Sequence, residues 1–297
     1  MNRVLLLGAP DPEMQAIEEL LKGAGETIAH MSAGGGRRVH PGNAYDITAY
    51  CGRRDHLYLV ECGGEVVGEN FTRIDHHRPG DTGYGMPPRR FMEASSIGQT
   101  IAELARLGKV PKGWEMSPDH FSLENGQFAT LPSGPVSVET PFGPRIVPQD
   151  IVYVAAADHC LAAAYRSECP GVDPDGLLGW RVTTRSRHQG RPADEIMDDV
   201  ARTREALETA PRLIMGGVAV ADMRRGKPWP ELVEAGTFAG IPYLAGPLGS
   251  PDGRKKYTLS GSAPAVEAFL QGEGPAADLA GRYGDPARGF AGGYKDE

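Results

Sequence analysis

The stretch that decides the fold is Val4-Leu5-Leu6-Leu7-Gly8-Ala9-Pro10-Asp11-Pro12-Glu13, which leads into MQAIEELL at residues 14–21. The consecutive apolar residues at 4–7 are typical of a strand that is buried on both faces of a sheet. The glycine and the prolines end that strand, and the next segment has apolar residues at helical spacing, with Asp11 able to cap it. A strand, an acidic loop and a helix in this order predict an α/β sheet, in which ligands bind beyond the carboxyl ends of the strands.

Acidic residues and histidines recur at the ends of apolar runs, including the expected strands at 56–60 and 70–74 and the run at 151–157. The clusters are Asp11 with Glu13, Glu61, Asp75-His76-His77, and Asp158-His159. We expect them to converge on one edge of the sheet, where so many carboxylates would repel each other without a cation. Two divalent metal ions about 3.5–4 Å apart would remove this repulsion. The oxygen-rich donor set with imidazoles favours Mn²⁺ or Mg²⁺ over a thiolate site for Zn²⁺.

Composition limits the partners that the chain can bind. The 297 residues are enough for one large or two ordinary domains, and 40% hydrophobic residues can form a core. A formal net charge of -8 argues against tight binding to long duplex nucleic acid, although a small anionic substrate fits if metal ions supply positive charge. No run approaches the roughly 18 apolar residues of a membrane span.

The four cysteines, Cys51, Cys62, Cys160 and Cys169, are not spaced as a zinc ribbon or a redox motif. We interpret them as buried reduced thiols of a cytoplasmic protein. Residues 1–7 are too short for a signal peptide and are expected to form the first strand.

The second half of the chain predicts another α/β unit. Strands are expected at 213–220, 243–244 and 255–260, and helices at 229–235 and 263–270. Arg185, Arg187 and His188 are expected on a solvated basic face.

Asp75-His76-His77 after a strand, with Ala94-Ser95-Ser96 further along, resembles the DHH phosphoesterase family. Asp11-Pro12-Glu13 is similar to the first Asp-x-Asp block of that family. Glu61 stands where its second-block aspartate would be, and Asp158 where its last acidic ligand would be. The tail 289–293, GFAGG, resembles the glycine-rich substrate-binding motif of the DHHA1 domain.

The resemblance implies two α/β domains. A DHH-like metal-binding catalytic domain with a mostly parallel sheet would span residues 1–192, with an inserted loop region at 108–149. A helical linker at 193–212 would lead to a smaller DHHA1-like substrate-binding domain at 213–297. The expected enzyme is a metal-dependent phosphoesterase that uses a metal-bound hydroxide to hydrolyse phosphodiester bonds of a small nucleotide, short oligonucleotide or cyclic dinucleotide. The sequence also allows a homodimer.

The resemblance also implies roles for individual residues. Metal ligands would be Asp11, Glu13, Glu61, Asp75, His76, Asp158 and His159, for two ions of Mn²⁺ or Mg²⁺. His77 and His76 would be catalytic. Substrate-binding residues in the tail would be Arg288, Gly289, Gly292 and Gly293.

The chain departs from the family pattern at several positions. Leu7 replaces the usual first-block histidine, and glutamates stand at Glu13 and Glu61 in place of aspartates. His159 could supply the missing imidazole, provided that the strand before Asp158 has already ended, since adjacent strand residues point to opposite faces. Three alternatives stay open: a catalytically degenerate nucleotide-binding or sensor protein, a phosphomonoesterase or pyrophosphatase, and a tail that is only a frayed terminus.

Overall fold

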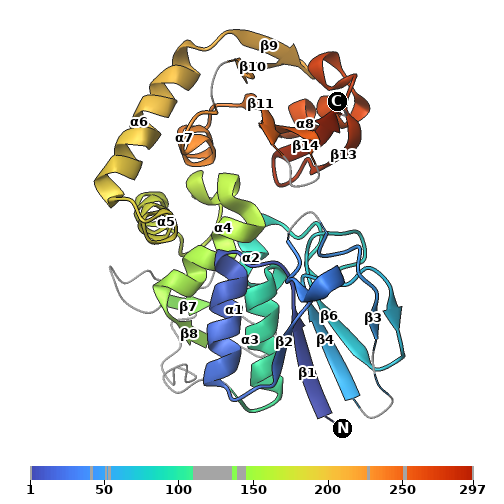
Figure 1. Ribbon diagram of the computed structural model, residues 1–297. Coiled ribbons are helices and arrows are strands. Elements are labelled where there is room, and N and C mark those ends of the chain that lie inside the picture. Colours follow the sequence, from blue (N-terminus) through green and yellow to red (C-terminus); the bar gives the residue numbers. More distant parts are fainter. Residues whose placement is uncertain are drawn as a thin grey trace. The chain divides into compact units, whose positions relative to one another are not determined.

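The computed structural model describes residues 2–40, 43–50, 52, 55–109, 136–138, 145–225, 228–249 and 253–295. Its chain divides into two compact units (Figure 1). The first contains the residues up to 160 together with 169–172, and the second contains 161–168 together with 173–297. Most of the expected insertion at 108–149 lies outside the described residues.

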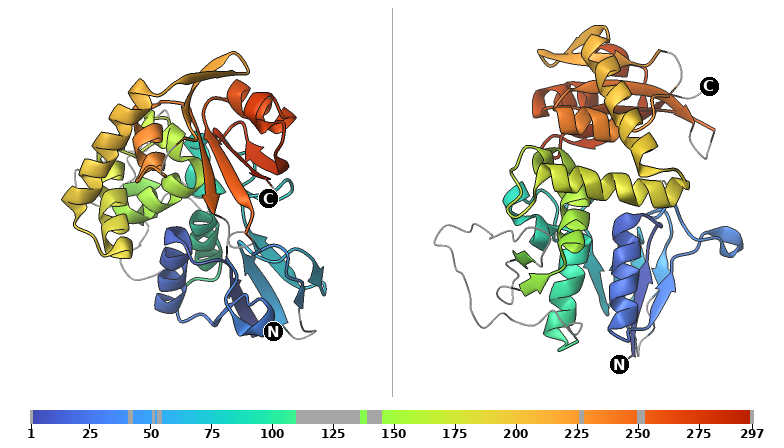
Figure 2. Two further views of the ribbon diagram at one scale, coloured as in Figure 1. Left: turned by 45° about the horizontal axis from the view of Figure 1, so that its top comes forward. Right: turned by 90° about the vertical axis from the view of Figure 1, so that its left-hand side faces the viewer.

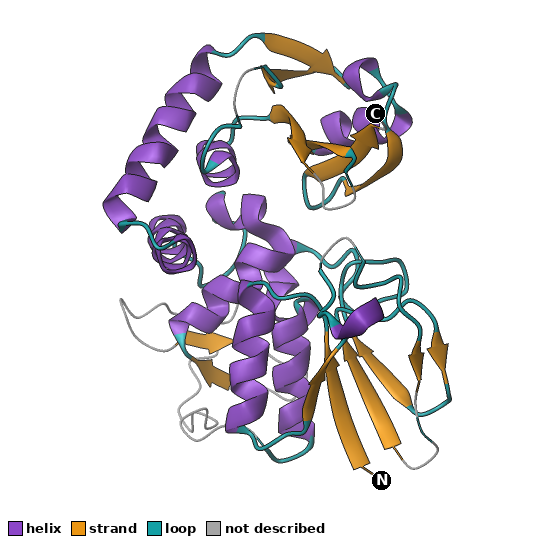
Figure 3. Ribbon diagram, in the orientation of Figure 1, coloured by secondary structure: helices purple, strands orange, loops and turns teal. Residues whose placement is uncertain are grey.

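The first unit is built on a four-stranded parallel sheet with the strand order β2-β1-β4-β6. Its strands are β1 (Asn2–Leu7), β2 (Ile28–His30), β4 (Asp55–Val60) and β6 (Phe71–Ile74). Figure 3 shows these strands running in one direction. The α/β class and the parallel sheet expected from the sequence are therefore confirmed.

Two helices, α1 (Pro12–Gly23) and α3 (Ser96–Arg106), pack on each other beside this sheet (Figure 2). Asp11 caps α1 by accepting a hydrogen bond from the Met14 backbone N–H at 2.7 Å. Ser95 caps α3 in the same way. Tyr58 of β4 donates to Glu103 of α3, whereas the alternate residues Leu57 and Leu59 pack on the other face. This alternation follows from the two-residue period of a strand.

The shorter elements of the first unit connect these layers. They are η1 (Gly34–Gly36), β3 (Ala49–Tyr50), β5 (Val66–Val67), η2 (Pro88–Arg90), α2 (Phe91–Ala94), β7 (Val136–Val138) and β8 (Arg145–Val147). β3 pairs with β5, and β7 pairs with β8. The antiparallel pair of β7 and β8 lies inside the region that we expected to be inserted.

The apolar run at 151–157 does not end a strand of the sheet. It lies within the helix α4 (Gln149–Tyr165), whose backbone departs from helical geometry at Cys160. A short run that is apolar on all sides fits a buried helix as well as a buried strand, so periodicity does not separate the two. Asp158 and His159 therefore belong to a helix, which removes the expected constraint that adjacent strand residues face opposite ways.

The second unit has a six-stranded mixed sheet with the strand order β13-β14-β12-β11-β10-β9. Its strands are β9 (Arg212–Met215), β10 (Val218–Met223), β11 (Tyr243–Gly249), β12 (Lys255–Ser260), β13 (Ala280–Asp285) and β14 (Phe290–Lys295). Its helices are α5 (Pro174–Gln189), α6 (Ala193–Thr209), α7 (Leu232–Ala239), α8 (Ala263–Gln271) and η3 (Gly274–Ala276). Only β10 and β11 pair in parallel among these strands.

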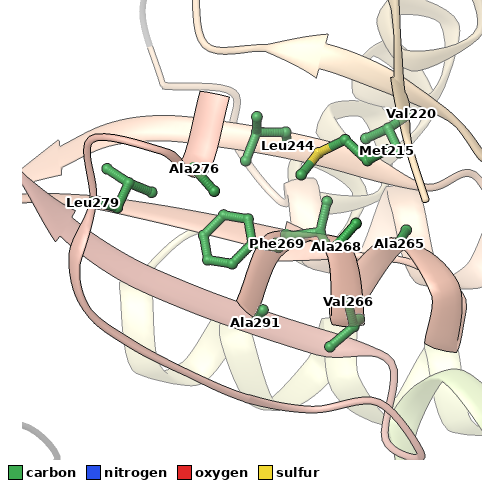
Figure 4. Close-up of a cluster of buried hydrophobic side chains, with 11 residues drawn as sticks. Met215, Val220, Leu244, Ala265, Val266, Ala268, Phe269, Ala276, Leu279 and Ala291 are labelled. Atoms are coloured by element: carbon green, nitrogen blue, oxygen red, sulfur yellow. The ribbon is translucent and has the colours of Figure 1, made fainter. Parts of the chain in front are cut away.

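Both faces of the mixed sheet are covered by helices. Val220 and Leu244 pack with Phe269 of α8 in the cluster drawn in Figure 4. Their neighbours Ala221 and Tyr243 belong to a second cluster that includes side chains of α6 and α7. The alternation again places adjacent strand residues in different cores.

The second unit begins earlier in the chain than the expected boundary after residue 192. The segment 193–209 is helical, as expected of the linker, but this helix packs on α5 and α7 and so belongs to the second unit. The single strand expected at 213–220 is a hairpin of β9 and β10. Its turn is formed by Gly216 and Gly217, whose φ angles are 54° and 76°. Two consecutive residues in this region strongly favour glycine.

The glycine-rich tail is a paired strand and not a frayed terminus. β14 lies between β12 and β13, and Gly292 is the register partner of Tyr283. A Cβ atom at Gly292 would lie 2.5 Å from the Tyr283 hydroxyl oxygen, so the tyrosine requires a glycine opposite it.

Three of the cysteines, Cys62, Cys160 and Cys169, are buried thiols, as expected, and Cys51 lies outside the described residues. Within the described ranges, no helix has the length and apolar character needed to cross a bilayer.

Candidate metal centre

The expected convergence of strand ends is present in the first unit. Leu7, Val60 and Ile74, the last residues of β1, β4 and β6, are register partners across the sheet. The segments that follow them therefore leave the sheet at one edge. Those segments contain Asp11 and Glu13, Glu61, and Asp75-His76-His77.

The strand ends approach each other closely at Gly8 and Glu61. A Cβ atom at Gly8 would lie 2.2 Å from the Glu61 carbonyl oxygen, so only glycine fits there. Glu61 itself has a φ of 50°, which is unusual for a residue with a side chain. Such backbone strain is found most often at functional sites.

Four side chains present their ligand atoms to one another. One atom each from Glu61, His76, His77 and Asp158 lies within 4.8 Å of the others. His76 Nε2 is 2.8 Å from Asp158 Oδ2, although the aspartate comes from α4 and not from the sheet. Oxygen and imidazole donors at this spacing are a suitable set for Mn²⁺ or Mg²⁺.

Glu13 lies beside this group and is fixed by a helix terminus. Its Oε1 atom accepts a hydrogen bond of 2.9 Å from the Ile97 backbone N–H, in the first turn of α3. Its Oε2 atom and Glu61 Oε1 are buried and receive no hydrogen bond from an N–H group or a hydroxyl among the described residues, and the side chains close to Glu13 are the carboxyl groups of Glu61 and Asp158. Burial, together with the nearby carboxyl groups of Asp158 and Glu61, holds the pKa of Glu13 well above its ordinary value.

The pKa values of Glu61 and Asp11 are shifted in the same direction. Burial, followed by the charge of Asp158, raises the pKa of Glu61 to about 8. The same two causes raise the pKa of Asp11 to about 6. Neighbouring buried carboxylates repel each other unless they share a proton or a cation. Buried carboxyl groups that face one another and have raised pKa values therefore favour a cation, and the residues present fit a divalent metal.

Asp75 has a different environment from these acids. Its Oδ1 atom accepts hydrogen bonds from the backbone N–H groups of His76 and His77, from Tyr45 Oη at 3.1 Å, and lies 2.9 Å from His77 Nδ1. Burial raises the pKa of Asp75, but the bonds from His77 and Tyr45 outweigh it and the net pKa is lowered. Asp75 thus orients His77, and it is not among the four mutually close ligands.

His77 is correspondingly basic. Burial lowers its pKa, but the bond to Asp75 and the charges of Glu61 and Asp158 raise it to about 9. Because Nδ1 is held by Asp75, the Nε2 atom is the one available to a ligand or a substrate.

His159 lies near the centre but has another contact. Its ring meets the ring of His76 edge to face, with centroids 5.2 Å apart. Its Nε2 atom lies 3.1 Å from the Met86 carbonyl oxygen. The four-residue group does not include His159, so its expected role as the replacement for the imidazole absent at Leu7 stays a prediction.

Several residues that hold the metal-site side chains and loops in place could not be identified from the sequence. Tyr45 comes from a loop 30 residues before Asp75. The side chain of Gln99 on α3 bonds both the carbonyl oxygen and the backbone N–H of Asp75. Arg73 on β6 donates to the carbonyl oxygens of Cys62, Gly63 and Gly64, and so holds the loop after Glu61. Their positions depend on the folded loops, so no spacing rule could identify them.

The expected substrate-binding residues lie in the second unit. Gly289 closes the turn between β13 and β14 with a φ of 75°, and Gly292 and Gly293 are buried in β14. The guanidinium carbon of Arg288 is 5.2 Å from the centre of the Phe290 ring. Because Gly292 accommodates Tyr283 and a Cβ at Gly293 would crowd Leu279, both glycines have packing reasons to be there.

Comparisons with protein-family models, with curated proteins and with solved structures found no match to this chain.

Proposed function

We propose that the chain is a metal-dependent phosphoesterase of DHH-like architecture, which hydrolyses phosphodiester bonds of a small nucleotide, a short oligonucleotide or a cyclic dinucleotide. The observation that carries the proposal is the group of Glu61, His76, His77 and Asp158, with ligand atoms within 4.8 Å of one another. The adjacent Asp11 and Glu13 supply further carboxylates, so we propose two ions of Mn²⁺ or Mg²⁺.

A bound divalent ion would neutralise charge on a phosphoryl oxygen and lower the pKa of water. The chain's own residues supply the remaining chemistry. His77, held by Asp75 at Nδ1, presents Nε2 to the centre, where it would be positioned to exchange a proton with the substrate. Tyr45 holds Asp75 in turn, which limits the orientations of the imidazole.

A second candidate is a nucleotide-binding or sensor protein that has lost full metal chemistry. Leu7 favours it, because this residue is completely buried at the position where the family has a histidine. A phosphomonoesterase or pyrophosphatase with the same centre is a third candidate. Assays on several classes of phosphate substrate distinguish it from a phosphodiesterase.

Metal content and hydrolysis test the proposal together. The full chain, purified in the presence of Mn²⁺, is analysed for bound metal and assayed on dinucleotides, cyclic dinucleotides, single-stranded DNA, nucleoside bisphosphates and pyrophosphate. The proposal expects about two Mn²⁺ per chain, from the two-ion chemistry of such centres, and cleavage of at least one phosphodiester. Bound metal with cleavage of pyrophosphate or monoesters alone favours the third candidate, and a chain without metal favours the binding protein.

A further inference from the structure

The candidate metal centre is open to solvent on the side of His77. Within the four-residue group, the His77 side chain is 34% exposed and that of Asp158 is 25% exposed, whereas the His76 side chain is completely buried. Glu61 is buried as well. A substrate therefore reaches the centre past His77, and the residues around this imidazole are the ones that it would contact.

Arg78 lies next to His77 on this open side. It follows His77 in the chain and is exposed. Its guanidinium carbon lies 3.8 Å from the centre of the Tyr45 ring, and the hydroxyl oxygen of the same tyrosine lies 3.2 Å from His77 Nδ1. Tyr45 thus contacts the imidazole with its hydroxyl group and the guanidinium with the face of its ring. The attraction between a guanidinium and an aromatic face restricts the position of the exposed arginine.

The stacked guanidinium of Arg78 keeps its hydrogen-bond donors. A guanidinium carries five N–H donors in its plane, so a contact through its face does not use them. Asp81 accepts a hydrogen bond of 2.7 Å from the Arg78 backbone N–H, and the guanidinium forms no hydrogen bond or ion pair with any of the described residues. Two other arginines of this unit are engaged, because Arg38 donates to the Gly8 carbonyl oxygen and Arg73 holds the loop after Glu61. Arg78 is therefore able to bind an anion.

The charge of the centre also favours a cation beside His77. Carboxyl groups lie in or next to the centre, and two divalent ions would balance them without a surplus of positive charge; these groups belong to Asp11, Glu13, Glu61 and Asp158. A phosphate substrate is itself anionic, and an arginine can bind it through two parallel N–H···O bonds. An arginine with unused donors at the open side supplies positive charge that the ions would not.

We propose that Arg78 is a substrate-binding residue, which binds a phosphate group of the substrate at the open side of the centre and is supported by the ring of Tyr45. The inference rests on the proposed phosphoesterase function, and it adds a residue that belongs neither to the metal ligands nor to the glycine-rich tail. The guanidinium can bind the phosphodiester that is cleaved or a neighbouring phosphate of the same molecule. In both cases Arg78 contributes to the affinity for the substrate and not to metal binding.

Calorimetric binding of two slowly hydrolysed probes tests the inference. The full chain loaded with Mn²⁺ is titrated with a dithymidine phosphorothioate and with the same molecule carrying a 5′-phosphate. Arg78→Ala should weaken the binding of at least one probe about tenfold, as for the loss of a hydrogen bond to a charged group, while the Mn²⁺ content stays the same. Weaker binding of both probes assigns the contact to the internal phosphodiester, and weaker binding of the phosphorylated probe alone assigns it to the neighbouring phosphate. Unchanged affinities for both probes would overturn the inference.

Two further variants and the unmodified chain complete the test. Arg78→Lys keeps the charge but loses the planar donors, so it should recover only part of the affinity. Arg106→Ala is the matched control, because the Arg106 side chain is 53% exposed at the C-terminal end of α3, whereas Glu13 binds Ile97 at the other end of this helix. An equal loss of affinity in Arg106→Ala would overturn the inference. An unmodified chain that binds neither Mn²⁺ nor the probes would contradict the proposed function itself.

Discussion

Buried acidic side chains have different charged neighbours in the two units. In the second unit, Glu231 and Glu234 are buried, but Arg185 and Arg181 lie against them. In the first unit, Glu13 and Glu61 are just as buried, yet carboxyl groups such as Asp158 are among their closest charged neighbours. An arginine partner balances the charge of a buried carboxylate, whereas a carboxylate among carboxylates requires a proton or an ion. Burial of acids alone is therefore a weak indication of a metal site, and the kind of charged group beside each acid is more informative.

The largest effect is expected from the substitution His76→Ala. It removes a buried imidazole from the four-ligand group, so bound metal should fall below half and phosphodiester hydrolysis should fall at least a hundredfold. His56→Ala is the matched control, because His56 lies in the same sheet and bonds Thr72 at the other end of β4. Retention of full metal content by the His76 variant would refute the proposed centre.

A large effect on stability is expected from Arg181→Ala. The substitution leaves Glu234 buried without its main cation, which typically costs about 3–5 kcal/mol. Urea unfolding measures this change. Arg204→Ala is the control, because its ion pair with Glu208 lies on an exposed face of α6 and should contribute little. Equal losses in the two variants would contradict the contrast between the units.

The pH dependence of stability should differ between the chelated and the metal-loaded protein. In the chelated chain the pKa values of Asp11 and Glu61 are raised to about 6 and about 8. A raised acid pKa contributes stability at low pH that is lost as pH rises through the folded value. Thermal unfolding of the chelated chain should therefore show a melting temperature that decreases from pH 5 to pH 8. The melting temperature of the Mn²⁺-loaded chain should change little over this pH range. The same pH dependence with and without Mn²⁺ would contradict a metal ion at this centre.

A smaller effect is expected from Tyr45→Phe. The variant loses the hydrogen bond to Asp75 Oδ1, so His77 is held less firmly, and kcat should fall about tenfold, as for the loss of one bond to a charged group. Metal content should be unchanged, and the pH profile of kcat should shift because the environment of His77 changes. A fall in bound metal would make Tyr45 a structural support of the ligands and not a positioning residue.

The smallest effect is expected from Arg288→Ala. If the arginine holds a phosphate of the substrate, KM should rise several-fold while kcat and stability stay the same. Truncation of the tail would be uninformative, because β14 is paired on both sides. An unchanged KM would leave the turn after β13 with a structural role only.

The local sequence was sufficient for much of the fold. The apolar run at 4–7, the capping residue Asp11, and the strands at 56–60 and 70–74 appear where their patterns predict them. These features depend on contacts between near neighbours or on a simple period of two or 3.6 residues. The convergence of Glu61 with Asp75-His76-His77 also follows from parallel strands that end at one edge.

Only the tertiary structure decided the remaining features. The run at 151–157 is helical because a uniformly apolar segment fits either buried element, and this places Asp158 against His76 from outside the sheet. Tyr45 reaches Asp75 through a loop whose path has no sequence period. Arg185, expected on a solvated face, is instead paired with the buried Glu231. Contacts of this kind depend on long-range packing, which no local sequence pattern predicts. The periods of strands and helices, in contrast, can be recognised from residues that are close together in the sequence.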